Sequence, residues 1–176
     1  TNSSNPTTVN SNPWLTNISS TQIRVRFRAI GLDADEYFYI DNVKLTGTPI
    51  SCSTPSTQAS TVTFSSILSD QMTVGWTRGG TPGDGVIVVA KAGSAPDDPV
   101  DGTSYTANAA FGSGTQIGTG TYVVFNGSGT SVNVTGLSAS TTYYFKAYEK
   151  NCTGTSTMIN TTSPASNNQA TTAACS

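Results

Sequence analysis

The best candidates for a chemical role in this sequence are three carboxylates close together in the stretch APDDPVDGTSY: Asp97, Asp98 and Asp101. Carboxylate oxygens grouped in this way can coordinate a calcium ion. Aspartate beside proline and glycine is also the usual residue of a turn, where its side chain bonds to nearby backbone. The composition of the stretch favours the turn, and a weak calcium site is the alternative.

Catalysis has little else to draw on in this sequence. The chain has no histidine, which excludes histidine bases and histidine metal ligands and leaves the serines and threonines without their usual activating group. The glycine-rich run FGSGTQIGTG lacks the Lys-Ser/Thr ending of a phosphate-binding loop, and no helical pattern follows it. The sequence therefore predicts a protein with no catalytic residues.

The surface is predicted to be polar but weakly charged. Ser, Thr and Asn occupy 66 of the 176 positions, against eight Lys and Arg, and the net charge is −2. A nucleic acid would meet few cations on such a surface. No apolar run approaches the roughly 18 residues that a membrane-spanning helix needs. We expect neither nucleic-acid binding nor membrane insertion.

Short apolar runs with a two-residue period predict an all-β chain. Val, Ile, Phe and Tyr recur at alternate positions, and no segment keeps a helical period for three turns. Residues 1–20 are polar and contain two prolines, which predicts an extended segment or linker. Residues 21–48 predict an antiparallel hairpin whose strands are QIRVRFRAI and YFYIDNVKL.

One face of this predicted hairpin is a candidate ligand surface. Its first strand places Arg24, Arg26 and Arg28 on the same side, and its second strand contributes Tyr37 and Tyr39. Guanidinium groups beside tyrosine rings can hold an acidic glycan. A solvated face with cation–π contacts is the alternative interpretation.

The run YFYIDNVKLTG resembles the last strand of jelly-roll carbohydrate-binding modules and related extracellular jelly rolls. The resemblance covers about 30 residues and implies that residues 21–48 are the closing hairpin of such a domain. It also implies that Asp41 helps to hold a structural calcium ion, the one cofactor we consider. Alternatively, Asp41 caps or pairs within the hairpin.

Two further motifs point to a second family. MTVGWT places Trp76 at the centre of a strand, and VTGLSASTTYYFKAYEK sets Leu137 six residues before Tyr143. On these motifs, residues 57–172 resemble a fibronectin type III domain of the kind found in large secreted bacterial proteins. The resemblance implies that Trp76 and Leu137 fill the core and that Tyr143 forms a tyrosine corner, with its hydroxyl bonded to nearby backbone.

The resemblance implies a β-sandwich whose remaining strands follow from the two-residue period. Tyr144, Lys146 and Tyr148 are expected to point outward, and FNGSGTSV is expected to form a hairpin turn with Gly127 and Gly129 at positive φ. The stretch 93–120 is far longer than the family's usual connection, so it either extends a sheet edge or forms a functional loop. The other expected strands lie at 62–64, 86–90, 105–107, 122–125, 132–134 and 155–159.

Three cysteines leave one without a partner in the chain. The fibronectin type III resemblance implies that Cys52 and Cys152 lie at the same pole of the sandwich and form a disulfide. Cys175 then stands where Cys52 does, one module later, and we expect it to pair with a cysteine of a following module that begins at residues 173–176.

The domain organisation that we predict is a linker at 1–20, a jelly-roll hairpin at 21–48 and a fibronectin type III domain at 52–172. Such modules resemble those of bacterial cell-surface adhesins and secreted enzymes, many exported by the type IX system. We therefore expect a non-catalytic extracellular or cell-surface module that acts in adhesion or as a spacer for binding domains. The alternatives are an accessory module of a secreted polymer-degrading hydrolase and a self-associating fibre subunit completed by strand exchange. The expected partners are adjacent modules of the same polypeptide and a glycan or other cell-surface ligand.

Overall fold

The computed structural model describes residues 52–175, which belong to one compact unit, Thr48–Ser176. The predicted linker at 1–20 and hairpin at 21–48 lie outside the described residues, as do Arg24, Arg26, Arg28, Tyr37, Tyr39 and Asp41. Within 52–175 no helix is long and apolar enough to span a membrane. The secondary structure of this part of the chain is strand, apart from a 3-10 turn at Gly154–Ser156.

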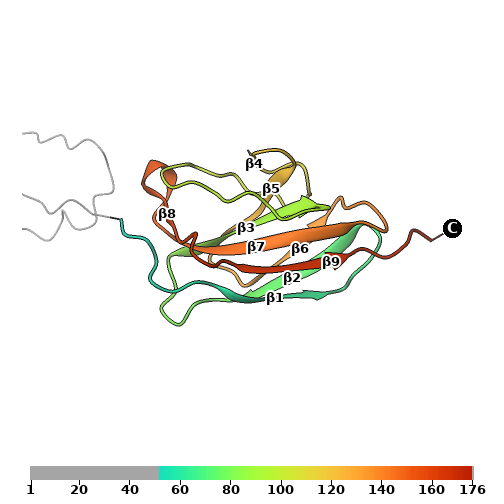
Figure 1. Ribbon diagram of the computed structural model, residues 1–176, viewed down its shortest axis with the longest axis horizontal. Coiled ribbons are helices and arrows are strands. Elements are labelled where there is room, and N and C mark those ends of the chain that lie inside the picture. The colour runs from blue at the N-terminus through green and yellow to red at the C-terminus, as the bar shows by residue number, and fades with distance from the viewer. Residues whose placement is uncertain (1–51, 176) are drawn as a thin grey trace, which may run out of the picture. The chain divides into compact units, whose positions relative to one another are not determined.

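Two antiparallel sheets form the layers of a sandwich (Figure 1). The three-stranded sheet has the order β1-β2-β6, and its strands are Ser60–Ser65, Gln71–Thr77 and Ser131–Thr135. The six-stranded sheet has the order β4-β5-β3-β7, with β8 and β9 both pairing with β7. Its strands are β3 (Gly85–Ala92), β4 (Gln116–Ile117), β5 (Thr121–Gly127), β7 (Thr142–Asn151), β8 (Met158–Ile159) and β9 (Ala165–Ala170). The predicted all-β sandwich of fibronectin type III type is confirmed.

The core between the sheets follows the strand period. Trp76 is 5% exposed, and its ring centroid lies 4.9 Å from that of Phe125 on the opposite sheet. Leu137 is buried just before β7, in the same apolar cluster. The hydroxyl of Tyr143 accepts a hydrogen bond of 2.9 Å from the backbone N–H of Ser138, which is the geometry of a tyrosine corner.

The predicted hairpin turn in FNGSGTSV is wrong, because β5 and β6 belong to different sheets and the segment crosses from one layer to the other. Neither Gly127 nor Gly129 has a positive φ. The ring of Phe125 lies against both glycines instead, since a Cβ at either position would stand 3.3 Å or 3.1 Å from its Cζ. Glycine is required here for close packing rather than for a turn.

The long stretch 93–120, which we call the insert, covers the outer face of the six-stranded sheet and forms a second core. Ile87, Val89 and Tyr148 are fully buried on that face, and Tyr105 and Ile117 of the insert pack against them. The expectation that Tyr148 points away from the first core holds, but its exposure was wrongly predicted. The insert, yellow-green in Figure 1, runs past β8 toward β4.

The insert contacts the other sheet as well. Backbone bonds join Phe111 to the Thr135 carbonyl and Thr135 to the Ala109 carbonyl, so the insert pairs with the edge of β6. The strand expected at 105–107 is not formed, although Asn108 donates to the Val123 carbonyl. At 155–159 the predicted strand is reduced to β8, because the preceding residues form the 3-10 turn.

Candidate functional site

The aspartates of the insert bond to the sheet beneath them. Asp97 Oδ2 accepts from Thr121 Oγ1 at 2.7 Å and from Lys91 Nζ at 3.1 Å. The bond from Thr121, followed by that from Lys91, holds the pKa of Asp97 below its ordinary value. Asp101 Oδ1 accepts from the backbone N–H of Ile159 at 2.6 Å. These contacts attach the insert to β3, β5 and β8.

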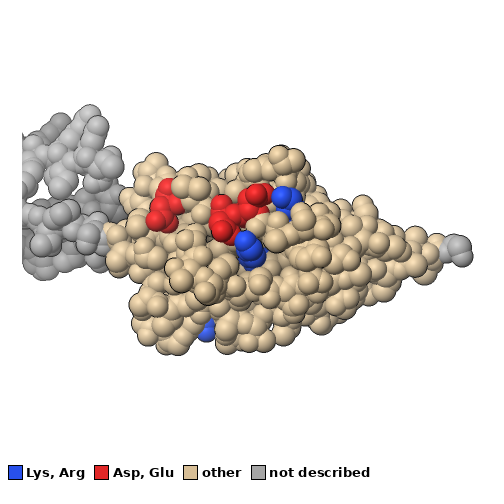
Figure 2. All heavy atoms as spheres, in the orientation of Figure 1, with Lys and Arg blue, Asp and Glu red and all other residues tan. Residues whose placement is uncertain are grey.

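Asp98 ties the insert to β7. Its Oδ1 accepts from Lys146 Nζ at 2.6 Å and from the hydroxyl of Tyr148 at 2.5 Å. These two bonds lower the pKa of Asp98, that from Lys146 most strongly. Burial, and then the hydrogen bond to Asp98, raises the pKa of Tyr148 above its ordinary value. Figure 2 shows acidic and basic side chains gathered on a face with few other charges.

The three aspartates do not converge on a common point, and no group of metal-ligating side chains occurs within residues 52–175. Each carboxylate faces a different strand. The contacts found differ from the turn interpretation, because the partners are residues of the strands rather than the backbone beside each aspartate.

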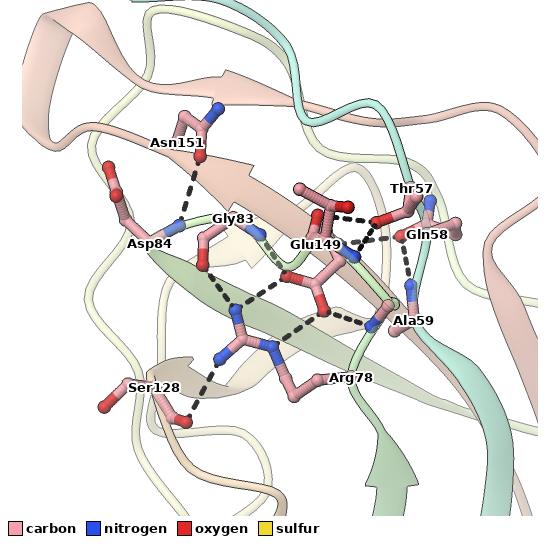
Figure 3. Close-up of polar contacts among 11 residues, drawn as sticks. Thr57, Gln58, Ala59, Arg78, Gly83, Asp84, Ser128, Glu149 and Asn151 are labelled. Carbon is pink, nitrogen blue, oxygen red and sulfur yellow. Dashed lines mark hydrogen bonds and ion pairs between the residues drawn. The ribbon is translucent and has the colours of Figure 1, made fainter.

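A buried ion pair that the sequence analysis missed lies at the pole where β3 begins (Figure 3). The carboxylate of Glu149 is fully buried and accepts two hydrogen bonds from Arg78, one from Nε and one from Nη2, each at 2.7 Å. The backbone N–H groups of Gly79 and Gly83 complete its four donors, at 3.1 Å and 3.0 Å. The bond to Glu149 raises the pKa of Arg78 above its ordinary value.

The strand period contained a signal for this pair. Arg78 follows Trp76 by two residues, and Glu149 follows Ala147 by two, so each continues an inward-facing series one step beyond the apolar core. Two charges of opposite sign at inward positions predict a buried pair if the strands meet. The period could not show that they meet, because Arg78 and Glu149 are 71 residues apart.

The structure joins Cys52 and Cys152 in a disulfide, the pairing that the resemblance implied. Cys152 has a φ of 60°, and its N–H donates to Asp84 Oδ2 at 2.7 Å. Asn151 donates to the Ser53 carbonyl at 2.7 Å, which adds a second link between the start of the domain and the end of β7. Cys175 is exposed and forms no disulfide within residues 52–175.

A hollow of about 410 Å³ opens at the same pole, on the outer face of the six-stranded sheet. Its lining includes Ile87 of β3, Asn126 of β5 and Lys150 of β7, which lie on three adjacent strands. Residues 103–105 of the insert form part of its wall. The hollow contains none of the residues that the sequence analysis selected as site residues.

The outer face of β3 begins with a glycine, which pairs with the Lys150 that lines the hollow. Gly85 shares this face with Ile87 and Val89, but the insert covers only the latter two. A Cβ at Gly85 would lie 3.2 Å from Cε of Lys150 and 2.8 Å from the carbonyl oxygen of Gly127. Glycine at position 85 therefore gives the lysine stem room to lie across the strand.

Comparisons with known proteins give one family match and several similar structures. The family described as "Purple acid Phosphatase, N-terminal domain" matches residues 55–165. No curated protein matches the chain.

Three solved structures are among those similar to the chain. A computationally redesigned β-sandwich protein is 16% identical with a TM-score of 0.45, and the match covers 66% of this chain and 95% of that one. The fn3 domain of the human collagen alpha-1(XX) chain is 16% identical with a TM-score of 0.39, covering 74% and 93%. A crystal structure of an FN3 domain of human collagen XX is 13% identical with a TM-score of 0.37, covering 65% and 100%. Since the family match spans most of the chain, the chain belongs to the family of the purple acid phosphatase N-terminal domain.

Proposed function

We propose that this chain is a non-catalytic extracellular module of a larger secreted or cell-surface protein, in which it spaces and presents neighbouring domains. The observation that carries the proposal is the use of its buried and clustered carboxylates. Glu149 accepts four donors within the fold, and Asp97, Asp98 and Asp101 each attach the insert to a strand. Groups held in this way stabilise a scaffold.

The disulfide supports the extracellular setting. Disulfides persist in oxidising compartments and are rare where glutathione keeps thiols reduced. The Cys52–Cys152 bond closes a loop of 100 residues in a chain that is only 35% apolar, so it compensates for a thin core. A module that keeps its neighbours at a fixed distance requires this kind of stability.

The family match favours a second candidate function, that of an accessory module in a secreted hydrolase. The family is named for the N-terminal domain of a phosphatase. In this version a catalytic domain of the same polypeptide acts on the substrate, and the present module positions that catalytic domain. In neither version do residues of the sandwich take part in catalysis.

The test is hydrolysis of p-nitrophenyl phosphate by the 176-residue chain. We expect no release of p-nitrophenol above the rate in buffer. Release that follows the protein through purification and disappears in an Asp98→Asn variant would overturn the non-catalytic assignment. The two versions can be distinguished in a polypeptide of this family that also contains a catalytic domain, by deleting the module and measuring the rate on polymeric substrate. An accessory role predicts a lower rate, whereas a spacer role predicts no change.

A further inference from the structure

The hollow at the pole is lined by two charged side chains, the buried cation Lys150 and the carboxylate of Asp84. Lys150 is 6% exposed, and its Nζ donates to the Cys152 carbonyl oxygen at 3.2 Å. None of the three ion pairs found in residues 52–175 includes it. Buried charges are usually paired, because desolvation of a lone ion is costly. An ammonium has three donors, and the Cys152 carbonyl is the one acceptor found for that of Lys150 within residues 52–175.

Burial acts on the ammonium in the direction expected of a site awaiting an anion. Desolvation lowers the pKa of Lys150 most strongly; the carboxylate of Asp84 opposes this effect, and the guanidinium of Arg78 adds to it. A ligand carboxylate beside Nζ would restore the charged form. A perturbed ionisable group in the wall of a hollow is a typical feature of a binding site.

The remaining lining describes the rest of the ligand. Hydroxyl groups of Thr103, Ser104, Ser128 and Thr153 line the hollow, and Asn126 adds an amide whose Nδ2 bonds to the Tyr105 carbonyl. Hydroxyls both donate and accept, which suits a ligand that carries hydroxyls of its own. Apolar contact for one face of a sugar ring comes from the half-buried Tyr105, which packs over the fully buried Ile87.

The volume also fits a small ligand, because ligand sites usually occupy about 300–1,000 Å³. We propose that the hollow binds a uronic acid unit of an acidic polysaccharide, with the sugar carboxylate on Nζ of Lys150 and the sugar hydroxyls on the rim. A free peptide carboxylate is less suitable, since this lining offers hydroxyls rather than apolar pockets for side chains. The inference does not rest on the proposed module role, because it concerns one surface of the domain.

The experiment is an NMR titration of the ¹⁵N-labelled 176-residue chain with D-galacturonate and, as a matched ligand, D-galactose. The two sugars differ in the carboxylate. We expect galacturonate to shift the amide signals of residues 84–87, 103–105, 126–128 and 150–157. Galactose should bind at least about tenfold more weakly, which corresponds to the lower end of the energy range of a charge-assisted hydrogen bond. Equal affinity for the two sugars, or shifts located elsewhere, would overturn the proposal.

A Lys150→Met variant keeps the aliphatic stem and removes the charge. It should weaken galacturonate binding by about tenfold or more, while Lys91→Met, at the opposite end of β3, should leave the affinity within twofold. If Lys150→Met does not fold, Ser104→Ala on the exposed rim serves instead and should weaken binding severalfold. If the folded variant of the hollow, Lys150→Met or Ser104→Ala, binds galacturonate with unchanged affinity, the proposed site is wrong.

Two more ligands distinguish other occupants. Acetate that shifts the same amides with the affinity of galacturonate would show an anion site without sugar selectivity, and would overturn the uronate assignment. N-acetyl-alanyl-alanine that binds where galacturonate does not would identify a peptide carboxylate site instead. Weaker binding of both probes than of galacturonate supports the proposal.

Discussion

Replacing Glu149 by glutamine tests how far the buried ion pair stabilises the sandwich. Oε1 of Glu149 accepts from Arg78 Nε and the Gly79 N–H, and Oε2 accepts from Arg78 Nη2 and the Gly83 N–H. Glutamine has the same shape but offers one oxygen. In either amide orientation, one guanidinium donor and one backbone N–H face an NH₂ group and lose their acceptor.

The cost follows from these two lost bonds. A buried donor without an acceptor costs about 1–3 kcal/mol, and removing one partner of a buried ion pair costs about 3–5 kcal/mol. The Arg78 side chain is 16% exposed, which allows water to replace part of the loss. We expect Glu149→Gln to lower the free energy of unfolding by about 3–5 kcal/mol, a large part of the 5–15 kcal/mol typical of a domain.

Urea unfolding at neutral pH measures the effect, and a Trp14→Phe background leaves Trp76 as the single tryptophan. Asp70→Asn removes a charge from an exposed side chain and serves as the matched control, with an expected change within about 0.5 kcal/mol. Arg78→Met completes a double-mutant cycle, in which the double variant should lose about 2–3 kcal/mol less than the sum of the single variants. A loss below about 1 kcal/mol for Glu149→Gln, or additive losses, would refute the reasoning.

Three further perturbations test other contacts. Replacing Cys52 and Cys152 by serine should cost up to about 4.7 kcal/mol in urea unfolding, the chain-entropy value for a loop of 100 residues, while Cys175→Ser should cost little. Tyr143→Phe leaves the backbone N–H of the corner without an acceptor, so thermal and urea unfolding should show a loss of about 1–3 kcal/mol. The pKa of Asp98 is lowered in the folded chain, first by the hydrogen bond from Lys146, so the unfolded chain binds more protons just below pH 4. The free energy of unfolding should therefore fall as the pH is lowered through this range. Asp98→Asn should make the fall shallower, which a series of urea midpoints at different pH values would measure.

Local patterns were sufficient to predict the inner core and most of its strands, but not β4 or β9, and the strand expected at 105–107 is not formed. The resemblance carried by MTVGWT implied that Trp76 lies in the core, and the resemblance carried by the spacing of Leu137 and Tyr143 implied the corner; each motif consists of residues close in sequence. Gly127 and Gly129 show where such patterns fail. Glycines between two strands indicate a turn, but whether the strands share a sheet depends on packing with Phe125 and Trp76.

The site residues were harder to predict because their roles arise from contacts across the fold. Tyr148 has the outward parity that the sequence indicates, and its burial is due to the insert, which has no strand period of its own. The hollow is lined by residues of the insert, of three strands and of the segment after β7, which lie far apart in the sequence. A pattern of polar residues does not contain that information.

The insert has two roles that deletion cannot separate. Its residues Tyr105 and Ile117 cover Ile87 and Tyr148, so removing the insert would expose a second apolar core to water. The same segment supplies Thr103 and Ser104 to the wall of the hollow, so its removal would also destroy the proposed site. Point substitution separates these roles, because an exposed rim hydroxyl contributes to ligand contact and little to packing, whereas the bond from Ile159 to Asp101 holds the insert in place. A domain whose loop seals a core and shapes a hollow can therefore change its ligand through the rim residues while keeping its stability.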